Sequence, residues 1–330
     1  ECLIASLRLQ EGPDAGEMID LDVPERLGEG TLERGDSIVV VHYTNPEAVD
    51  AGVEYQFADR DRKPALIALI VVFAVAVVAL GRLRGLAALA GLVASLAILL
   101  SFVLPSILEG NSPLLVAVTG ASAIAFVALY AAHGINVRTT VALLGTIASL
   151  ALTALLGTMF SGVARLTGLL SEEVPFLQLA AGRIDFEGIF LAGLVIGALG
   201  ALDDMTVTQA SVVWELRTAG LRDSRELFRS AMRVGRDHVS STVNTLALAY
   251  AGASTTLLLL FVLSGERITQ IGNGEIVATE IVRTLVGSIG LVASVPITTM
   301  LAVRLSAAPP EAEEPPETAP PADASPSPVE

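Results

Sequence analysis

The stretch GALGALDDMTVTQAS (197–211) places two adjacent carboxylates, Asp203 and Asp204, at the end of an apolar run that begins near Gly188. A helix rises about 1.5 Å per residue, so Asp204 would lie roughly 24 Å from Gly188 in a bilayer whose apolar core is about 30 Å thick. An acid in a bilayer costs roughly 2.5 to 3.5 kcal/mol at the helix centre and less near the ends. Such acids usually face the inside of a bundle. The stretch therefore predicts a polytopic α-helical transmembrane bundle.

Long apolar runs extend on both sides of this stretch. The chain has 330 residues, of which 52% are hydrophobic, and its mean hydropathy is +0.65. A helix that crosses a bilayer needs about 20 apolar residues. Seven segments meet this requirement, and they are 65–81, 86–104, 114–132, 139–160, 187–208, 239–263 and 281–303. Buried helices of a soluble protein are the alternative, but seven such runs favour about seven spans in a mainly α domain over residues 64–305.

The two ends of the chain differ from this domain in charge. Residues 1–63 carry fifteen acids and six bases, and residues 306–330 carry six acids and no base. The segments CLIASLRL (2–9) and DSIVVVHY (36–43) predict strands, so we expect residues 1–63 to form a small β-rich, barrel-like domain. Residues 306–330 are rich in Pro, Ala and Glu, which predicts a disordered tail. An acidic chain of this kind has no electrostatic footprint for nucleic acid.

The arginines predict how the bundle is oriented. Connections rich in arginine usually lie on the cytoplasmic side of a membrane. The connections with an arginine excess contain Arg82 and Arg84, Arg138, six arginines in 209–238, and Arg304. The N-terminal domain would then be extracytoplasmic and the C-terminal tail cytoplasmic. Arg60, Arg62 and Lys63 conflict with this orientation, although Asp59 and Asp61 accompany them.

The fifth segment has one face of small and polar residues. Steps of three and four bring together Gly193, Gly197, Gly200, Asp204, Thr208 and Ser211. Small residues let a neighbouring helix approach closely, so Asp204 is expected in the seam between the two helices. Asp203 is turned about 100° away on the helix. The sequence therefore favours Asp204 over Asp203 as the central group of a site.

The sixth segment offers partners for these acids. Asp237, Ser241 and Asn244 share one face, with His238 beside them. The predicted site for an ion, a proton or a substrate lies between the fifth and sixth spans, and it consists of Asp204, Asp203, Thr208, Asn244, Ser241 and Asp237. The fourth and seventh spans carry similar stripes, Thr146, Ser149, Thr153 and Gly157 in one and Gly287, Gly290, Ser294 and Thr298 in the other. We interpret these two stripes as helix-packing surfaces, with a polar pathway as the alternative.

A basic stripe lies between the fifth and sixth segments. Its members are Arg222, Arg225, Arg229, Arg233 and Arg236, which span about 80° of one helix face. Leu227, Phe228, Ala231 and Met232 lie largely opposite. We expect an amphipathic helix over 212–237 whose arginines contact anionic lipid headgroups at the cytoplasmic leaflet. The alternative is that these arginines only fix the orientation of the protein.

Two stretches resemble those of the YibE/F-like family of bacterial multi-pass membrane proteins. They are GALGALDDMTVTQASVVWEL (197–216) and GRDHVSSTVNTLALAYAG (235–252), and the order of spans also agrees. The resemblance implies a polytopic protein of the bacterial plasma membrane. Family members usually begin with a further N-terminal helix, which fits a sequence that starts at Glu1 rather than Met. The resemblance implies no substrate and no catalytic residue.

Several functions remain open for the acids. An ion- or proton-coupled transporter is favoured, since a carboxylate in a seam can exchange a proton or bind a cation, although the sequence has no clear inverted repeat. The main alternative is a membrane scaffold or accessory subunit that recruits a partner protein through the N-terminal domain. A metal site of Asp203, Asp204, Asp237 and His238 is less favoured, because its spacing is not a recognised ligand pattern.

Enzyme chemistry finds little support in the sequence. An intramembrane aspartyl enzyme would use Asp204 and Asp237, but the sequence contains no Gly-x-Gly-Asp. It also lacks a nucleotide-binding loop, a G-x-S-x-G elbow and zinc-ligand spacing. We therefore expect no enzyme activity, no cofactor and no metal.

Overall fold

The computed structural model divides the chain into two compact units, Glu1–Leu80 and Gly81–Glu330. The residues that it describes are 2–24, 33, 35–45, 54–169, 174–181, 184–265 and 268–306. The predicted disordered tail therefore lies outside the described residues from residue 307 onward.

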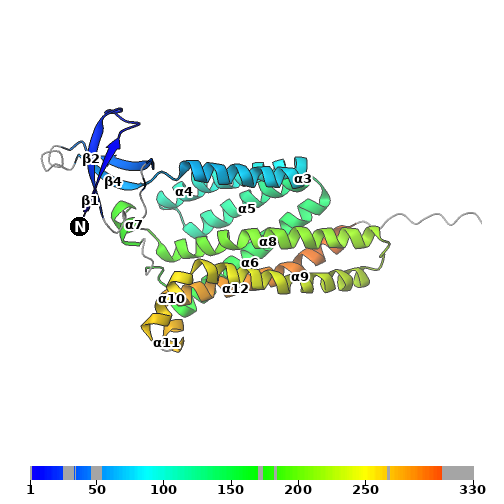
Figure 1. Ribbon diagram of the computed structural model, residues 1–330. Helices are drawn as coiled ribbons and strands as arrows, with labels where there is room; N and C mark the ends of the chain where they lie inside the picture. Colours follow the sequence, from blue (N-terminus) through cyan, green and yellow to red (C-terminus); the bar gives the residue numbers. More distant parts are fainter. Residues whose placement is uncertain are drawn as a thin grey trace, which may run out of the picture. The chain divides into compact units, whose positions relative to one another are not determined.

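The N-terminal unit contains two antiparallel hairpins (Figure 1). Strand β1 (Cys2–Arg8) pairs with β2 (Met18–Pro24), and β3 (Ile38–His42) pairs with β4 (Tyr55–Arg60). The predicted strand region at the N-terminus is thus confirmed. Its described strands form two two-stranded sheets, whereas the sequence led us to expect a barrel.

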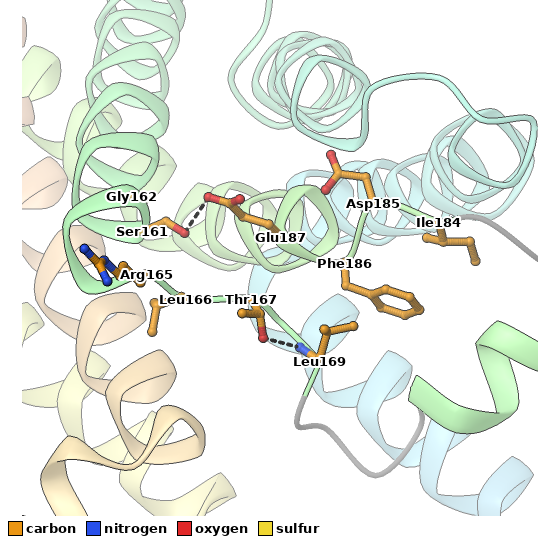
Figure 2. Close-up of a pocket in the computed structure, with 10 residues that line it drawn as sticks. All are labelled: Ser161, Gly162, Arg165, Leu166, Thr167, Leu169, Ile184, Asp185, Phe186 and Glu187. Atoms are coloured by element: carbon orange, nitrogen blue, oxygen red, sulfur yellow. Dashed lines mark hydrogen bonds between the residues drawn. The ribbon is translucent and has the colours of Figure 1, made fainter.

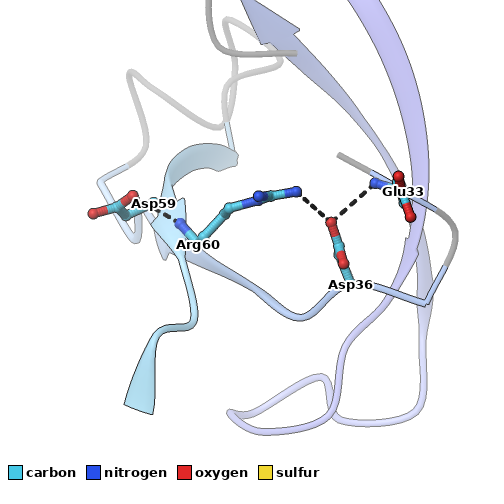
Figure 3. Close-up of polar contacts among 4 residues, drawn as sticks. All are labelled: Glu33, Asp36, Asp59 and Arg60. Atoms are coloured by element: carbon cyan, nitrogen blue, oxygen red, sulfur yellow. Dashed lines mark hydrogen bonds and ion pairs between the residues drawn. The ribbon is translucent and has the colours of Figure 1, made fainter. Parts of the chain in front are cut away.

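Two carboxylates stabilise the ends of β3 and β4 (Figure 3). Asp36, which precedes β3, accepts hydrogen bonds from the Glu33 backbone N–H at 2.9 Å and from Arg60 Nη2 at 2.5 Å. Both contacts lower the pKa of Asp36 below its ordinary value, the backbone bond most strongly. Hydrogen bonds from the Arg62 side chain and the Arg60 backbone likewise lower the pKa of Asp59.

The Asp36 contacts should make the N-terminal unit sensitive to acid. Because folding lowers the pKa of Asp36 from 3.8, its stabilising contribution is present above that value and is lost as the pH falls through the folded-state pKa. We expect Asp36→Asn to reduce amide hydrogen-exchange protection over residues 35–45 at pH 6. The difference from the wild type should shrink below about pH 3.5. Equal protection of the two proteins at pH 6 would contradict this.

The rest of the described chain is helical. The elements are α3 (Lys63–Ile98), the π-helical turn η1 (Leu99–Val103), α4 (Leu104–Leu108), α5 (Pro113–His133), α6 (Val137–Ala164), α7 (Val174–Ala181), α8 (Phe186–Thr218), α9 (Ser224–Ala253), α10 (Thr255–Ser264), α11 (Ile268–Asn273) and α12 (Glu275–Leu305). Side-chain caps begin three of the long helices. Asn136, Asp185 and Asp223 accept hydrogen bonds from the first-turn N–H groups of α6, α8 and α9, respectively.

Five helical segments of the described chain are long and apolar enough to cross a membrane, or six if the bent pair α9 and α10 is one span. The predicted count of seven is not confirmed, and the difference arises at two places. The first two predicted spans lie in one helical segment, Lys63–Leu108, in which two helices are joined by a kink at Arg82, within the connection predicted between them. The predicted sixth span is divided by a bend of 65° between Ala253 and Thr255.

Helices α6, α8 and α12 form the centre of the second unit, with α5 and α9 packed against them (Figure 1). Leucines such as Leu150, Leu194 and Leu291 are buried in this core. Leu155 on α6 and Val292 on α12 remain exposed on the outside. Large apolar side chains on the outside and hydroxyl groups within are typical of helices that pack in lipid. The helical part is therefore consistent with a multi-pass membrane protein.

Candidate functional site

Asp203 of α8 faces α6. Its Oδ1 lies 3.3 Å from the hydroxyl of Thr146, which donates to it. The Thr146 hydroxyl also lies 2.7 Å from that of Thr206, one turn beyond Asp203 on α8. Both threonine side chains are completely buried, and Asp203 itself is half-buried. A carboxylate and two hydroxyl groups thus meet inside the α6–α8 interface.

This cluster can exchange its hydrogen bonds. A hydroxyl carries one proton, so Thr146 can donate either to Asp203 or to the Ala142 carbonyl oxygen, which lies 3.1 Å away. The Thr206 hydroxyl can donate to the Asp203 carbonyl oxygen at 3.1 Å or share a proton with Thr146. The hydroxyl and carbonyl oxygens around Asp203 can therefore form hydrogen bonds with both its ionised and its protonated carboxyl group. Oxygen atoms of this kind are also the ligands that hard cations prefer.

Asp204 lies outside this cluster, contrary to the expectation that it would occupy the seam. Its side chain is 68% exposed, and its Oδ2 is 3.6 Å from Nε2 of His238 on α9. The glycine face that was predicted to be packed is largely open, since a β carbon added at Gly193 or Gly200 would meet nothing within 4 Å. The buried face of α8 instead carries larger residues, among them Leu202. Asp203 borders that face.

The other predicted site residues do not join Asp204. Thr208 is half-buried on α8, whereas Asp237, Ser241 and Asn244 are exposed on α9. Within the described residues, the polar contact of Asp204 is with His238. Asp204 thus approaches the sixth predicted span beside Asp237, but no hydrogen bond or ion pair among the described residues links it to Thr208, Asp237, Ser241 or Asn244. Two residues outside the predicted site, Thr146 and Thr206, contact Asp203 instead. The sequence pointed only weakly to these two contacts. Thr206 follows Asp203 by three residues and so lies one helical turn away, and Thr146 was assigned to the fourth-span stripe.

The stripes of the fourth and seventh predicted spans meet each other. A β carbon added at Gly145 of α6 would clash with the Thr298 hydroxyl of α12 and lie 3.2 Å from its Cβ. One added at Gly290 of α12 would clash with the Thr153 hydroxyl of α6. The hydroxyl groups of Ser149, Thr153 and Ser294 bond to carbonyls of their own helices. The prediction that these stripes are packing surfaces is confirmed.

A second contact between a carboxylate and a hydroxyl lies where α6 ends and α8 begins (Figure 2). The Ser161 hydroxyl donates to Glu187 Oε1 at 2.9 Å. Both residues line a cavity of about 510 Å³, to which Arg165 and Asp185 also contribute. Ser161 is 15 residues from Thr146 along α6, and Glu187 is 16 residues from Asp203 along α8. The two contacts are thus roughly 22 to 24 Å apart along the helices.

Apolar side chains separate these two contacts. Gly157 of α6 lies between them, and a β carbon added there would be 3.2 Å from Leu191 Cδ2 and 3.6 Å from Leu194 Cδ1. Leu150 belongs to the same buried cluster as these two leucines. Water has no hydrogen-bonding partners among such side chains, so this layer closes the interface between Asp203 and the cavity.

The predicted basic stripe is exposed along its length, over Arg222, Arg225, Arg229, Arg233 and Arg236. All but the first belong to α9, which begins at Ser224 and continues into the predicted sixth span. Leu227 and Ala231 on the opposite face are fully buried. Arg225 and Arg229 also line a cavity of about 340 Å³ together with Phe228, Met300 and Arg304, among others. Cations and apolar side chains thus meet where α9 approaches α12.

One of the comparisons with known proteins identifies a family. The family model described as YibE/F-like protein matches residues 69–307. This range includes Thr146, Asp203, Glu187 and the basic stripe, and it begins after strand β4. No curated protein and no solved structure matches the chain.

Proposed function

The chain belongs to the YibE/F-like family, and we propose that it is an ion- or proton-coupled transporter of the bacterial plasma membrane. The observation that carries the proposal is the contact of Asp203 with Thr146 and Thr206 inside the α6–α8 interface. Placing a charged carboxylate between transmembrane helices costs free energy, because it loses contact with water. Such a carboxylate therefore usually has a function. In this proposal Asp203 takes up and releases a proton or a small cation.

The cavity beside the Ser161–Glu187 contact would serve as one entrance, and the second would have to open past Val141 and Val213, which are fully buried beyond the Asp203 cluster. The Ser161–Glu187 contact opens on the cavity, and the Asp203 cluster lies on the far side of the leucine layer. Transport then requires α6 and α8 to shift so that Leu191 and Leu194 leave the path while the opposite end closes. Movements of packed helices of this kind underlie alternating access in transporters.

The arginines support one orientation for this transporter. In the proposal the segment Lys63–Leu108 crosses the membrane twice, with its kink at Arg82 on the cytoplasmic side, so that the N-terminal domain is extracytoplasmic and α9 begins at the cytoplasmic surface. The exposed stripe and the cavity lined by Arg225, Arg229 and Arg304 would hold phosphate groups of anionic lipids, with Phe228 and Met300 beside the acyl chains. The proposal includes no catalytic step.

The experiment that tests this function is ion flux through the purified protein in proteoliposomes. An entrapped pH indicator reports proton movement, and radioactive sodium or potassium reports cation movement. Flux above that of empty liposomes, lost on replacement of Asp203, is the expected outcome. Flux indistinguishable from that of empty liposomes under every imposed gradient would contradict it.

A scaffold role remains a second candidate because the N-terminal domain exposes apolar side chains. Val39 and Val41, on the same face of β3, are each 42% exposed, and Ile4 on β1 is 70% exposed. An exposed apolar strand favours contact with another protein. We expect Val39→Thr with Val41→Thr to remove a species cross-linked to the domain in membranes while ion flux is unchanged. Threonine keeps the strand propensity. A cross-linked species that persists in this variant would argue against the scaffold.

A further inference from the structure

Three metal-binding side chains meet in the N-terminal unit. Asp14 lies between β1 and β2, His42 ends β3, and Glu54 precedes β4. One ligand atom from each residue lies within 4.8 Å of the others, and His42 Nε2 is 3.6 Å from Glu54 Oε1. Asp14 and His42 are half-buried, while Glu54 is exposed. The cluster therefore brings together one imidazole and two carboxylates from three separate segments.

Tyr55 orients two of these three side chains. Its ring stacks on the His42 ring, with 4.7 Å between the centroids and 11° between the planes. Its hydroxyl donates a hydrogen bond to Asp14 Oδ2. Partners that fix a ligating imidazole and a ligating carboxylate in this way are typical of the outer shell of metal sites. Tyr55 thus holds His42 and Asp14 ready for a shared ligand.

The charges of the cluster also favour a cation. Two carboxylates close together repel each other, and the segment that contains them, residues 1–63, carries fifteen acids against six bases. The apolar core of the same domain is small, since Leu9, Leu21 and Val23 are its buried apolar side chains among the described residues. Small domains with little core commonly rely on a disulfide or a metal, and Cys2 is the single cysteine of the chain.

We propose that Asp14, His42 and Glu54 bind a divalent transition metal ion of the zinc class, which joins the β1–β2 hairpin to the β3–β4 hairpin. The imidazole ligand favours such an ion over calcium or magnesium, which prefer oxygen ligands alone. Ligands about 2.1 Å from a tetrahedral zinc lie roughly 3.4 Å from one another. The ligand atoms, which lie within 4.8 Å of one another, would therefore have to close by at most about 1.4 Å, and the His42–Glu54 pair at 3.6 Å is already near this spacing. The site is independent of the proposed transport and lies before the range matched by the family model.

Zinc titration of the full-length protein tests this proposal. The protein carries a tag without histidine, is purified in detergent, and is freed of metal with a chelator before calorimetry with Zn²⁺. We expect one tight site per chain, and Glu54→Gln and His42→Asn should each weaken it by at least about tenfold. His238→Asn is the matched control, because His238 and Asp204 form the other histidine–carboxylate contact of the described chain. That variant should keep the affinity of the wild type.

Tyr55→Phe gives a test that leaves all three ligands in place. It keeps the ring that stacks on His42 but removes the hydroxyl that holds Asp14, so zinc affinity should fall about tenfold. Circular dichroism before each titration identifies variants that have lost their fold. If His42→Asn is unfolded, Glu54→Gln still tests the site, because Glu54 is exposed on the surface. The proposal is overturned if the protein binds no zinc, if binding survives Glu54→Gln and Tyr55→Phe unchanged, or if His238→Asn removes it.

Discussion

Replacing Asp203 with asparagine should reduce ion flux in proteoliposomes to the level of empty liposomes, while yield and melting temperature in detergent stay close to those of the wild type. Asparagine has nearly the same shape as aspartate, and its amide oxygen can still accept the hydrogen bond from Thr146. It cannot release a proton or offer a negative charge to a cation. The packing of α6 against α8 should therefore survive the change, whereas exchange at the site should not.

Asp204→Asn is the matched control for this prediction. Asp204 is the next residue on the same helix and has the same chemistry, but its side chain is 68% exposed and approaches only His238 in the described structure. Flux through this variant should stay within about twofold of the wild type, since screening by solvent makes exposed charge pairs weak. A different result for Asp203→Asn, in which folding and flux are lost together, would mean that this carboxylate is structural.

Gly145→Ala should destabilise the contact between α6 and α12. The added β carbon would clash with the Thr298 hydroxyl and lie 3.2 Å from Cβ and 3.3 Å from Cγ2 of the same residue, so rotation of the threonine does not clear the space. Overpacking of a core costs about 1 to 3 kcal/mol. The better helix propensity of alanine offsets about 1 kcal/mol of this. The melting temperature in detergent, followed by circular dichroism, should therefore fall.

Two further variants separate this clash from other effects of alanine. Gly193→Ala on α8 meets nothing within 4 Å and should leave the melting temperature unchanged or raise it. Thr298→Ala combined with Gly145→Ala removes the clashing hydroxyl and should recover part of the lost stability. If Gly145→Ala and Gly193→Ala gave the same melting temperature, α6 and α12 would not approach each other as closely as the structure has them.

The packing surfaces of α6 and α12 were predictable from the sequence, whereas the packed face of α8 and the placement of its acids were not. Hydroxyl and glycine stripes on 139–160 and 281–303 indicated close helix contacts, and α6 and α12 meet along them. For 187–208, the helical wheel correctly separated Asp203 from Asp204 but could not say which face is packed. We assumed that the glycines were buried. Larger side chains such as Leu202 and Met205 fill the core instead, because a larger buried side chain makes more dispersion contacts with its neighbours than a glycine does.

Contacts between segments that are distant in the chain also could not be predicted from the sequence. Thr146 and Thr206 are 60 residues apart and meet only because α6 and α8 run antiparallel. Asp14, His42 and Glu54 follow no recognised ligand spacing, and strand pairing together with Tyr55 brings them into one cluster. The break at Arg82 falls inside the connection that the sequence predicts between 65–81 and 86–104. The bend after Ala253 was missed, because it is set by backbone geometry that hydropathy does not report.

The account depends most on Asp203 as the group that exchanges an ion within the α6–α8 interface. Its most direct test is the ratio of flux through Asp203→Asn to flux through Asp204→Asn, with equal amounts of folded protein reconstituted and the same gradient imposed. We predict a ratio near zero. A ratio near one, or a loss of flux only when Asp204 is replaced, would contradict the account.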